Sequence, residues 1–319
     1  MIEVKNLTKR YGNHLAVDHL NFTVESGKIY GFLGPNGAGK STTMNIMTGY
    51  LGATEGQVLI DGHDILQEPE EAKKNIGYLP EIPPLYMEMT VREYLEFAAE
   101  LKGIKKDKRE SQIEEVIRLA KLRDVENRLI QNLSKGYKQR VGLAQAVLGF
   151  PEIIILDEPT VGLDPKQIIE IRELIRKLAK KHTVILSSHI LAEVREVCDY
   201  IMIISGGKLV ASDTTENLEN MMSGKGQIEV EAKAPRDEMD HIIRRTGKIK
   251  EVKYRTSASG ITTAQITAKG GEDIREELFL AFSHADVPML TLNQSKTTLE
   301  EIFLELTQGS GNRMIKEEK

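Results

Sequence analysis

Short apolar runs alternate with longer segments of helical periodicity from the amino terminus to about residue 222. The runs at 29–33, 153–156 and 184–187 consist mostly of apolar residues. Strands that are buried on both faces of a parallel sheet have this composition. Because helical segments lie between these runs, the pattern predicts an α/β domain with a largely parallel sheet over residues 1–222.

Strand-like patterns are missing between about residues 83 and 149. Residues 90–93, Thr-Val-Arg-Glu, have the form of a capping box that opens a helix. Further on, Ile113, Val116, Ile117 and Ala120 recur at helical spacing. We therefore expect a helical subdomain inserted into the α/β domain.

A different pattern follows a break that contains Gly and Ser at residues 223–226. Apolar and polar residues alternate at 228–232 and 264–268, which predicts two half-buried strands. Helical faces lie at 274–282 and 299–306, and weaker signals indicate a helix at 237–245 and strands at 252–254 and 290–292. The first six elements of this β-α-β-β-α-β-α order match the ferredoxin-like arrangement. We expect a small α+β domain at residues 223–309 and a polar tail at 310–319.

Composition and charge exclude several classes of function. The chain has 319 residues, a formal net charge of -5 and one cysteine, Cys198. Because nucleic-acid binding usually needs a basic surface, we expect no nucleic-acid partner. A single cysteine cannot form an intramolecular disulfide, and no apolar stretch approaches the roughly 20 residues that span a bilayer. The amino terminus lacks the apolar core of a signal peptide, so the sequence predicts a soluble, cytoplasmic protein.

One loop carries a phosphate-binding motif. Residues 34–41 match G-x-x-x-x-G-K-S/T at every fixed position. An apolar run precedes the loop, and the residues that follow can continue as a helix. The nucleotide-binding residues expected here are Gly34, Pro35, Asn36, Gly37, Ala38, Gly39, Lys40, Ser41 and Thr42.

The residue types of this loop suit a phosphate ligand. Glycines let backbone N–H groups curl around phosphate oxygens, and the helix that follows turns its positive dipole end toward them. Lys40 can reach the β- and γ-phosphates, and the Ser41 hydroxyl can bind Mg²⁺. An ordinary Gly-rich turn is the alternative, and the motif alone does not distinguish kinases, GTPases and ATPases.

A second site narrows the choice. The apolar run at 153–156 ends in the acidic pair Asp157 and Glu158. Asp157 can bind Mg²⁺ directly or through water, and Glu158 can polarise the attacking water as a general base. An acidic turn after a buried strand is the alternative, which the phosphate loop disfavours. The two motifs together favour an enzyme that uses ATP with Mg²⁺.

Upstream of this pair, residues 133–140, Leu-Ser-Lys-Gly-Tyr-Lys-Gln-Arg, resemble the signature LSGGQ of the ABC ATPase family. The resemblance covers roughly residues 1–220 and implies a P-loop ABC ATPase domain with an inserted helical subdomain. In that family the signature completes the ATP site of the opposite subunit, which implies a dimer, here expected to be a homodimer. The resemblance implies that Ser134 and the Gly136 amide contact the partner's γ-phosphate, and these residues open a helix whose end can face an anion. A plain helix start is the alternative, which the position between the phosphate loop and the acidic pair disfavours.

Other residues match positions of the same family. The resemblance implies that Tyr11 stacks on adenine, with an ordinary loop tyrosine as the alternative. It implies that Asp164, in Val-Gly-Leu-Asp, belongs to a loop linking the two ATP sites, and that His189 contacts the γ-phosphate during catalysis. Glu81 stands where the family usually has glutamine. A carboxylate still offers oxygen to Mg²⁺ or water, but it cannot donate a hydrogen bond while ionised.

Two further departures from the family lie within the signature. Lys135 replaces its first glycine, and Tyr137 replaces its glutamine. Because Ser134 and Gly136 remain, we expect a working site with altered affinity or rate.

The resemblance further implies a partner in the membrane. ABC transporter ATPases drive an integral membrane permease, which would hold this chain on the cytoplasmic face of the membrane. The ending at residues 297–307 resembles that of exporter-type cassettes. Together with Leu-Pro-Glu at 79–81, it resembles the bacterial group that includes drug-efflux, sodium-efflux and gliding-motility ATPases. We therefore expect export as the direction of transport.

Soluble ABC ATPases are the alternative within the family. Ribosome-acting types carry two cassettes, and chromosome-maintenance types split one cassette with a coiled coil, whereas this sequence has one contiguous cassette and no heptad run. A soluble assembly factor for iron–sulfur clusters uses one cassette but does not need the region after Met222. A module that binds nucleotide without hydrolysis is a further alternative, which the presence of Glu158 disfavours.

Overall fold

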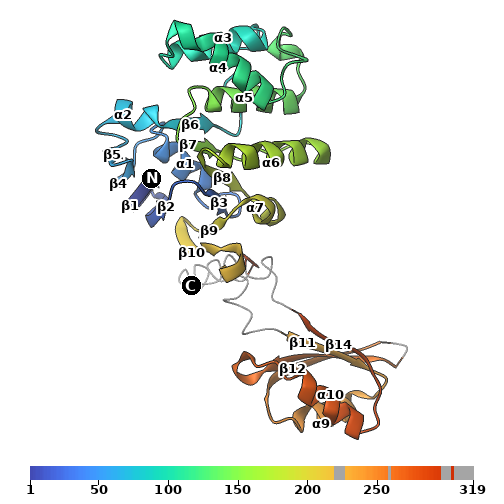
Figure 1. Ribbon diagram of the computed structural model, residues 1–319. Coiled ribbons are helices and arrows are strands. Elements are labelled where there is room, and N and C mark those ends of the chain that lie inside the picture. Colours follow the sequence, from blue (N-terminus) through green and yellow to red (C-terminus); the bar gives the residue numbers. More distant parts are fainter. Residues whose placement is uncertain (219–226, 258–259, 296–302, 305–319) are drawn as a thin grey trace. The chain divides into compact units, whose positions relative to one another are not determined.

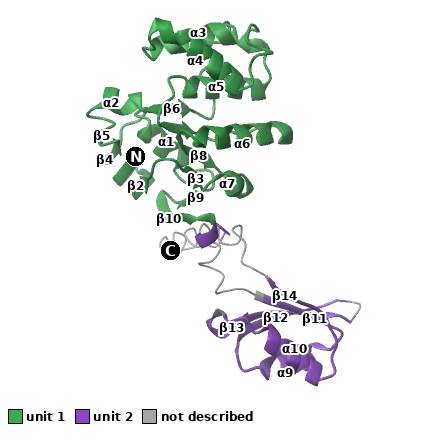
Figure 2. Cartoon of the chain, viewed as in Figure 1, with its two compact units in different colours: residues 1–215, 306–319 green, residues 216–305 purple. Residues whose placement is uncertain are grey.

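The computed structural model describes residues 1–218, 227–257, 260–295 and 303–304 (Figure 1). The chain divides into two compact units, one that includes residues up to Thr215 and one that begins at Glu216 (Figure 2). The break expected at 223–226, the domain boundary at Met222 and the polar tail at 310–319 lie outside the described residues. The same holds for the helix expected at 299–306, of which only Phe303 and Leu304 are described, in helical conformation.

Unit 1 contains a six-stranded sheet. Its strands, in spatial order, are β10 (Lys208–Thr214), β9 (Tyr200–Ser205), β3 (Ile29–Leu33), β8 (Thr183–Ser188), β7 (Ile153–Leu156) and β6 (Ile76–Leu79). Neighbouring strands from β9 to β6 are parallel, and β10 pairs antiparallel with β9. The prediction of a largely parallel sheet is therefore confirmed, and so are the three strands predicted from apolar runs.

A second, antiparallel sheet in unit 1 was not expected from the sequence. It consists of β2 (His14–Val24), β1 (Ile2–Tyr11), β4 (Glu55–Ile60) and β5 (His63–Asp64), in this spatial order. The pairing of β1 with β2 changes register three times along its length. Asn6 and His19 have left-handed backbone conformations with φ of 49° and 51°. Such irregularities break the period of two that reveals a half-buried strand, so the alternation is obscured.

Helices follow three strands of the parallel sheet. They are α1 (Lys40–Met47) after β3, α6 (Pro165–Ala179) after β7 and α7 (Leu191–Val197) after β8; a shorter helix, α2 (Pro69–Lys74), precedes β6. Phe32 of β3, Met44 of α1 and Ile155 of β7 are fully buried in one apolar core that also includes the antiparallel sheet. Because the strands are parallel, the loops that follow β3, β7 and β8 meet at one edge of the sheet, which is where α/β proteins bind ligands.

Helices occupy the segment between β6 and β7. They are α3 (Val91–Leu101), α4 (Lys106–Leu119), the 3-10 helix η1 (Ile130–Asn132) and α5 (Lys135–Val147), and Figure 1 shows α3, α4 and α5 grouped at one end of unit 1. The predicted capping box is confirmed: the Thr90 N–H donates to Glu93 Oε2 at 2.8 Å, and Thr90 Oγ1 accepts from the Glu93 N–H at 3.2 Å.

Between residues 227 and 295, the described part of unit 2 contains four strands and two α-helices. Their order is β11 (Gln227–Ala232), α9 (Arg236–Arg244), β12 (Ile249–Thr256), β13 (Thr262–Ala268), the 3-10 helix η2 (Lys269–Gly271), α10 (Arg275–His284) and β14 (Met289–Ser295). The sheet order is β12-β13-β11-β14, with antiparallel neighbours. Ile228, Met239, Ile266 and Phe282 are fully buried in a core of this unit. The strands predicted at 228–232 and 264–268 are confirmed as β11 and β13.

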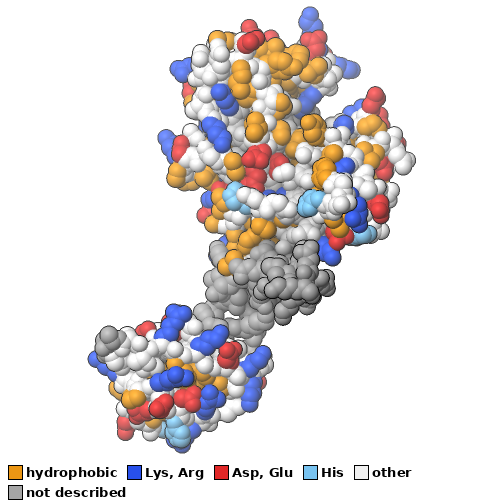
Figure 3. Space-filling view, turned by 180° about the vertical axis from the view of Figure 1, so that it is seen from behind, with side chains coloured by type: hydrophobic (Ala, Val, Ile, Leu, Met, Phe, Trp, Pro, Cys, Tyr) orange, Lys and Arg blue, Asp and Glu red, His pale blue; other side chains and the backbone are white. Residues whose placement is uncertain are grey.

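Charged side chains of both signs are interspersed on the face of each unit that Figure 3 shows. This distribution agrees with the small net charge of -5. Within the part of the chain that the structure describes, none of the helices has the length and apolar character needed to cross a membrane.

Candidate nucleotide-binding site

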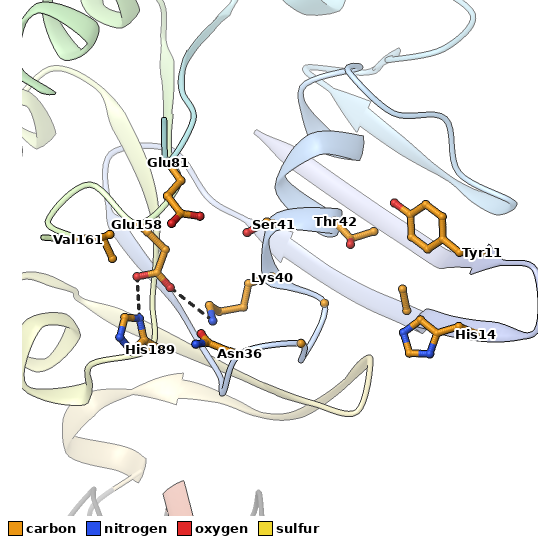
Figure 4. Close-up of a pocket in the computed structure, with 13 residues that line it drawn as sticks. Tyr11, His14, Asn36, Lys40, Ser41, Thr42, Glu81, Glu158, Val161 and His189 are labelled. Carbon is orange, nitrogen blue, oxygen red and sulfur yellow. Dashed lines mark hydrogen bonds and ion pairs between the residues drawn. The ribbon is translucent and has the colours of Figure 1, made fainter. Parts of the chain in front are cut away.

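The loops at the edge of the parallel sheet line an open cavity of about 470 Å³. Its lining residues are Tyr11, His14, Ala16, Asn36, Gly37, Gly39, Lys40, Ser41, Thr42, Glu81, Glu158, Val161 and His189. Figure 4 shows Tyr11 and His14 toward one end and Glu158, Val161 and His189 toward the other, with the phosphate-loop residues between them. The cavity thus unites segments from β1 and β2, the loop after β3, and the loops after β6, β7 and β8.

The phosphate loop requires glycine for two different reasons. Gly37 and Gly39 have φ of 81° and 104°, in the left-handed region that other residues rarely adopt. A Cβ atom at Gly34 would lie 2.5 Å from the Ile204 carbonyl oxygen, and one at Gly39 would lie 2.5 Å from the Ala16 carbonyl oxygen. The chain can therefore turn sharply from β3 into α1, so that the unpaired N–H groups at the start of the helix are available to an anion.

The Lys40 side chain places its own positive charge on the wall of the cavity. Its side chain is buried, and its ammonium donates to the Gly34 carbonyl oxygen at 2.8 Å. The same ammonium lies 3.4 Å from Glu158 Oε1. A buried ammonium needs anionic or carbonyl partners, and phosphate oxygens would supply further ones.

Ser41 and Asp157 form an oxygen pair suited to a hard cation. Ser41 Oγ donates to Asp157 Oδ1 at 3.2 Å, and Ser187 Oγ donates to the same oxygen at 2.5 Å. Burial raises the pKa of Asp157 above its usual value, although both hydroxyl groups oppose that shift. The described residues contain no group of three or more His, Cys, Asp or Glu that could hold a metal. One carboxylate and one hydroxyl are nevertheless enough for Mg²⁺, which keeps most of its waters.

Glu158 is held between a cation and an imidazole. Its backbone has φ of 46°, a left-handed conformation at the end of β7, and its N–H donates to Ser187 Oγ at 2.8 Å. Its Oε2 lies 3.0 Å from His189 Nδ1, and Figure 4 shows both side chains at the same end of the cavity. Because an ionised carboxylate only accepts, the imidazole is the donor in this contact. A buried carboxylate fixed in this way is placed to accept a proton.

The opposite end of the cavity is more open. Tyr11 is 48% exposed, and the Lys9 ammonium lies 5.3 Å from the centre of its ring. His14 and Ala16, on β2, line this end as well. Neither residue belongs to a sequence motif, so their only signal in the sequence is their nearness to Tyr11.

Glu81 also borders the cavity and has an exposed side chain. Ser41 and Glu158 line the same cavity, but Glu81 forms no hydrogen bond to either of them in the described residues. Its role as a Mg²⁺ ligand stays a prediction.

The signature residues do not line this cavity. Ser134 is the N-cap of α5, and its Oγ accepts from the Tyr137 N–H at 3.4 Å. Asp164 is the N-cap of α6, and its Oδ1 accepts from the Gln167 N–H at 2.9 Å. Gly136 is buried, and a Cβ atom there would lie 2.5 Å from the Gln167 side chain.

The two replaced signature positions make contacts within the chain. The Lys135 ammonium lies over Gly162, at 2.2 Å from the position that a Cβ atom would take. The Tyr137 hydroxyl donates to Asp124 Oδ2 at 2.5 Å. These contacts join the start of α5 to the loop after β7 and to the segment before α5.

Comparison with known proteins agrees with this arrangement. Residues 17–161 match the family model described as ABC transporter. The bacitracin transport ATP-binding protein BcrA of Bacillus licheniformis is 42% identical over 221 residues, which cover 69% of this chain and 71% of that protein. The linearmycin resistance ATP-binding protein LnrL of Bacillus subtilis (strain 168) is 30% identical over 308 residues, or 96% and 98% of the two chains.

Two solved structures are similar to part of the chain. The ATP binding subunit of an ABC transporter has a TM-score of 0.64 and 32% identity, covering 70% of this chain and 93% of that one. The dimeric ATP-binding cassette MJ0796, bound to ADP and Pi in a post-hydrolysis state, has a TM-score of 0.61 and 28% identity, covering 67% and 98%. The similarity to LnrL, by contrast, extends over almost the whole chain.

Proposed function

The chain belongs to the family of ABC transporter ATP-binding proteins, as the ATP-binding and ATP-hydrolysing subunit of such a transporter, and we propose that it powers export through a separate membrane permease. The observation that carries the proposed chemistry is the position of Glu158 in the cavity. Its carboxylate lies 3.4 Å from the Lys40 ammonium and 3.0 Å from His189 Nδ1.

The phosphate loop holds the nucleotide in this proposal. Backbone N–H groups between Gly34 and Thr42 surround the phosphates, and the Lys40 ammonium neutralises charge on the β- and γ-phosphates. Ser41 and Asp157, with Glu81 beside them, would hold Mg²⁺, which supplies positive charge to the phosphate oxygens. At the other end of the cavity, the Tyr11 ring stacks on adenine.

Hydrolysis needs a base and a group that orients it. Glu158 accepts the proton of the attacking water, while Lys40 offsets the negative charge of the phosphoryl group. The His189 imidazole holds the Glu158 carboxylate in one orientation and reaches toward the γ-phosphate. The hydrogen bond between His189 and Glu158 supports these roles, because it fixes the two side chains relative to each other.

A second copy of the chain completes each site in this proposal. Ser134 and Gly136 lie at the start of α5, outside the cavity of their own chain, where they can face a phosphate held by another copy. Asp164, at the start of α6, belongs to the loop that would link the two sites. Dimeric cassettes occur among the similar structures.

The remaining regions serve the transporter. We infer that the helices at about 83–149 form the helical subdomain of the cassette. We infer also that residues 223–309 form a ferredoxin-like accessory domain, supported by the order β-α-β-β-α-β and the sheet order β12-β13-β11-β14. This domain serves regulation or dimer contacts and contributes no catalytic group. The permease holds the assembled subunits on the cytoplasmic face of the membrane.

Export is the direction that the relatives support. BcrA is named for bacitracin transport and LnrL for linearmycin resistance, and removal of a toxic compound from the cell would give resistance. Extraction of native membranes with mild detergent should recover this chain bound to an integral membrane protein. Recovery in the soluble fraction alone, under several extraction conditions, would contradict the proposed partnership.

The catalytic proposal is tested by Lys40→Ala. Removing the ammonium should lower steady-state phosphate release by at least about 10²–10³-fold, because the phosphates lose a preorganised cation. The fold should persist, which thermal unfolding of both proteins would show. Lys181→Ala, at an exposed lysine outside the cavity, is the matched control and should keep the wild-type rate. A Lys40→Ala protein that hydrolyses ATP normally would refute the assignment.

A further inference from the structure

A buried carboxylate is hydrogen-bonded to residues close in sequence to Glu158 and His189. Glu193, in the first turn of α7, is only 7% exposed. Its Oε2 accepts from Thr160 Oγ1 at 2.5 Å and from Ser188 Oγ at 3.2 Å. Thr160 and Ser188 are themselves buried. None of these three residues lines the cavity itself.

One hydroxyl partner, Thr160, lies in the loop that carries Glu158, and the other, Ser188, is the last residue of β8. Thr160 comes two residues after Glu158, and Ser188 comes immediately before His189. Ser188 Oγ also accepts from the Ile190 N–H at 3.0 Å, which fixes the backbone on the other side of His189. One carboxylate oxygen therefore connects the loop after β7 with the end of β8, next to His189.

Stability alone does not account for an acidic residue at this position. In the described residues Glu193 has no recorded ion pair, so its charge is compensated by hydrogen bonds from hydroxyl groups. Burying a carboxylate without a cation is costly, and apolar residues of similar volume are often neutral or stabilising in its place. The carboxylate does, however, accept hydrogen bonds from both the loop after β7 and the end of β8, which an apolar side chain cannot do.

We propose that Glu193 is a positioning residue for ATP hydrolysis, which sets the relative position of Glu158 and His189 by holding the loop after β7 against the end of β8. This inference rests on the catalytic roles proposed above for those two residues. The Glu158 and His189 side chains lie 3.0 Å apart, so small shifts of either loop change their contact. Misplacement of reacting groups by about 1 Å can lower a rate by about 10²-fold.

Three variants separate positioning from simple stability. Glu193→Ala removes the shared acceptor, and Thr160→Val removes one donor at nearly constant volume, so that the second variant remains informative if the first does not fold. Each should lower kcat by about 10- to 100-fold while the Kd for ATP changes by less than about threefold, because the phosphate loop is untouched. Glu193→Gln keeps an amide oxygen that can accept from both hydroxyls, and it should recover kcat to within about threefold of wild type.

Val194→Ala is the matched control. Val194 is fully buried in the same helix, and its side chain packs against Gly31 of β3. This variant should lower the melting temperature but leave kcat near the wild-type value. The positioning role is overturned if Glu193→Ala, like Val194→Ala, loses stability but keeps kcat near the wild-type value. It is also overturned if Val194→Ala lowers kcat as much as Glu193→Ala does, or if the Gln variant is as impaired as the Ala variant. Glu158→Gln, assayed in parallel, distinguishes the two proposals: if it loses activity and Glu193→Ala does not, only the positioning role fails.

Discussion

Asp157 and Glu158 are neighbours in the sequence, yet the fold gives their carboxylates different surroundings. Two serine hydroxyls donate to one oxygen of Asp157. Glu158 instead lies between the Lys40 ammonium and the His189 ring. The left-handed backbone of Glu158 turns its side chain away from the direction that a continuing strand would give it. These surroundings support metal binding by the first carboxylate and proton transfer by the second.

The raised pKa of Asp157 leads to a prediction about stability. Because its folded pKa lies above the unfolded value of 3.8, the folded state binds the proton more tightly, and stability falls as pH rises through the interval between the two pKa values. Above both pKa values the cost of the buried charge is fully present. Asp157→Asn should therefore raise the melting temperature of the protein without ligand.

The same substitution should remove the extra thermal stability that MgATP confers on the wild type, because the amide no longer supplies a negative oxygen to Mg²⁺. Differential scanning fluorimetry at pH 7.5, with and without MgATP, measures both effects. Asp237→Asn, at an exposed position on α9, is the control and should change neither value appreciably. A lower melting temperature for Asp157→Asn without ligand would contradict the effect that we assign to burial.

Sequence reasoning finds those site residues that belong to contiguous motifs. Lys40 and Glu158 stand at fixed distances from glycines or from an apolar run, and the structure brings them to 3.4 Å. His14 and Glu193 belong to no such motif. Glu193 acts through Thr160, 33 positions earlier in the chain. Contacts of this kind depend on how the strands pair and on the packing of α7, which a local pattern does not record.

At the level of secondary structure, prediction succeeded where periodicity is regular. Buried strands such as β7 and β8, and the alternating strands β11 and β13, have a clear pattern and were identified. The antiparallel sheet has no such pattern in the sequence, because the pairing of β1 with β2 shifts register and so disrupts the alternation. The capping box at Thr90 was predicted because its two hydrogen bonds are formed between residues only three positions apart.

That capping box gives a prediction about one helix. Thr90→Ala removes the hydroxyl that accepts from the Glu93 N–H at the start of α3, and it should lower the free energy of unfolding by about 0.5–2 kcal/mol. Urea denaturation followed by circular dichroism measures the change. Ser111→Ala, at an exposed position within α4, is the control; it should be neutral or slightly stabilising, because alanine favours a helix interior. Equal destabilisation by both variants would argue against a capping contribution.

At the scale of the whole molecule, the two units have separate cores and only one of them lines the cavity. Unit 2 buries its own apolar cluster, which includes Ile228 and Phe282. The residues that line the nucleotide cavity all belong to unit 1. A chain that ends at Met222 should therefore still bind ATP with a Kd within about threefold of the full-length value, a change of less than about 1 kcal/mol.

Isothermal titration calorimetry of the shortened chain measures that affinity, and circular dichroism shows whether the chain is folded. The full-length protein carrying Lys40→Ala is a control for specific binding, because its phosphate loop lacks the central cation. A shortened chain that is folded but does not bind ATP would show that residues beyond Met222 contribute to the site.

The last prediction concerns assembly of two chains. Glu158→Gln keeps the shape of the side chain but gives up the basic carboxylate, so hydrolysis should slow by about 10²–10⁴-fold. ATP would then persist in the cavity, held by Lys40 and the rest of the phosphate loop. Its γ-phosphate would bridge to Ser134 and Gly136 of a second copy. Size-exclusion chromatography with light scattering should find a dimer in ATP and a monomer in ADP, which lacks the bridging phosphate.

A substitution at the proposed bridge distinguishes it from other ways of forming a dimer. Ser134 is exposed at the start of α5, so an arginine there need not disturb the core of its own chain. Ser134→Arg, combined with Glu158→Gln, should place bulk between the two chains and return the ATP-loaded protein to a monomer. Ser111→Arg in the same background adds a similar side chain at another exposed site and should leave the dimer intact. A dimer that forms equally well without ATP, or that survives Ser134→Arg, would mean that the signature does not close the opposite site.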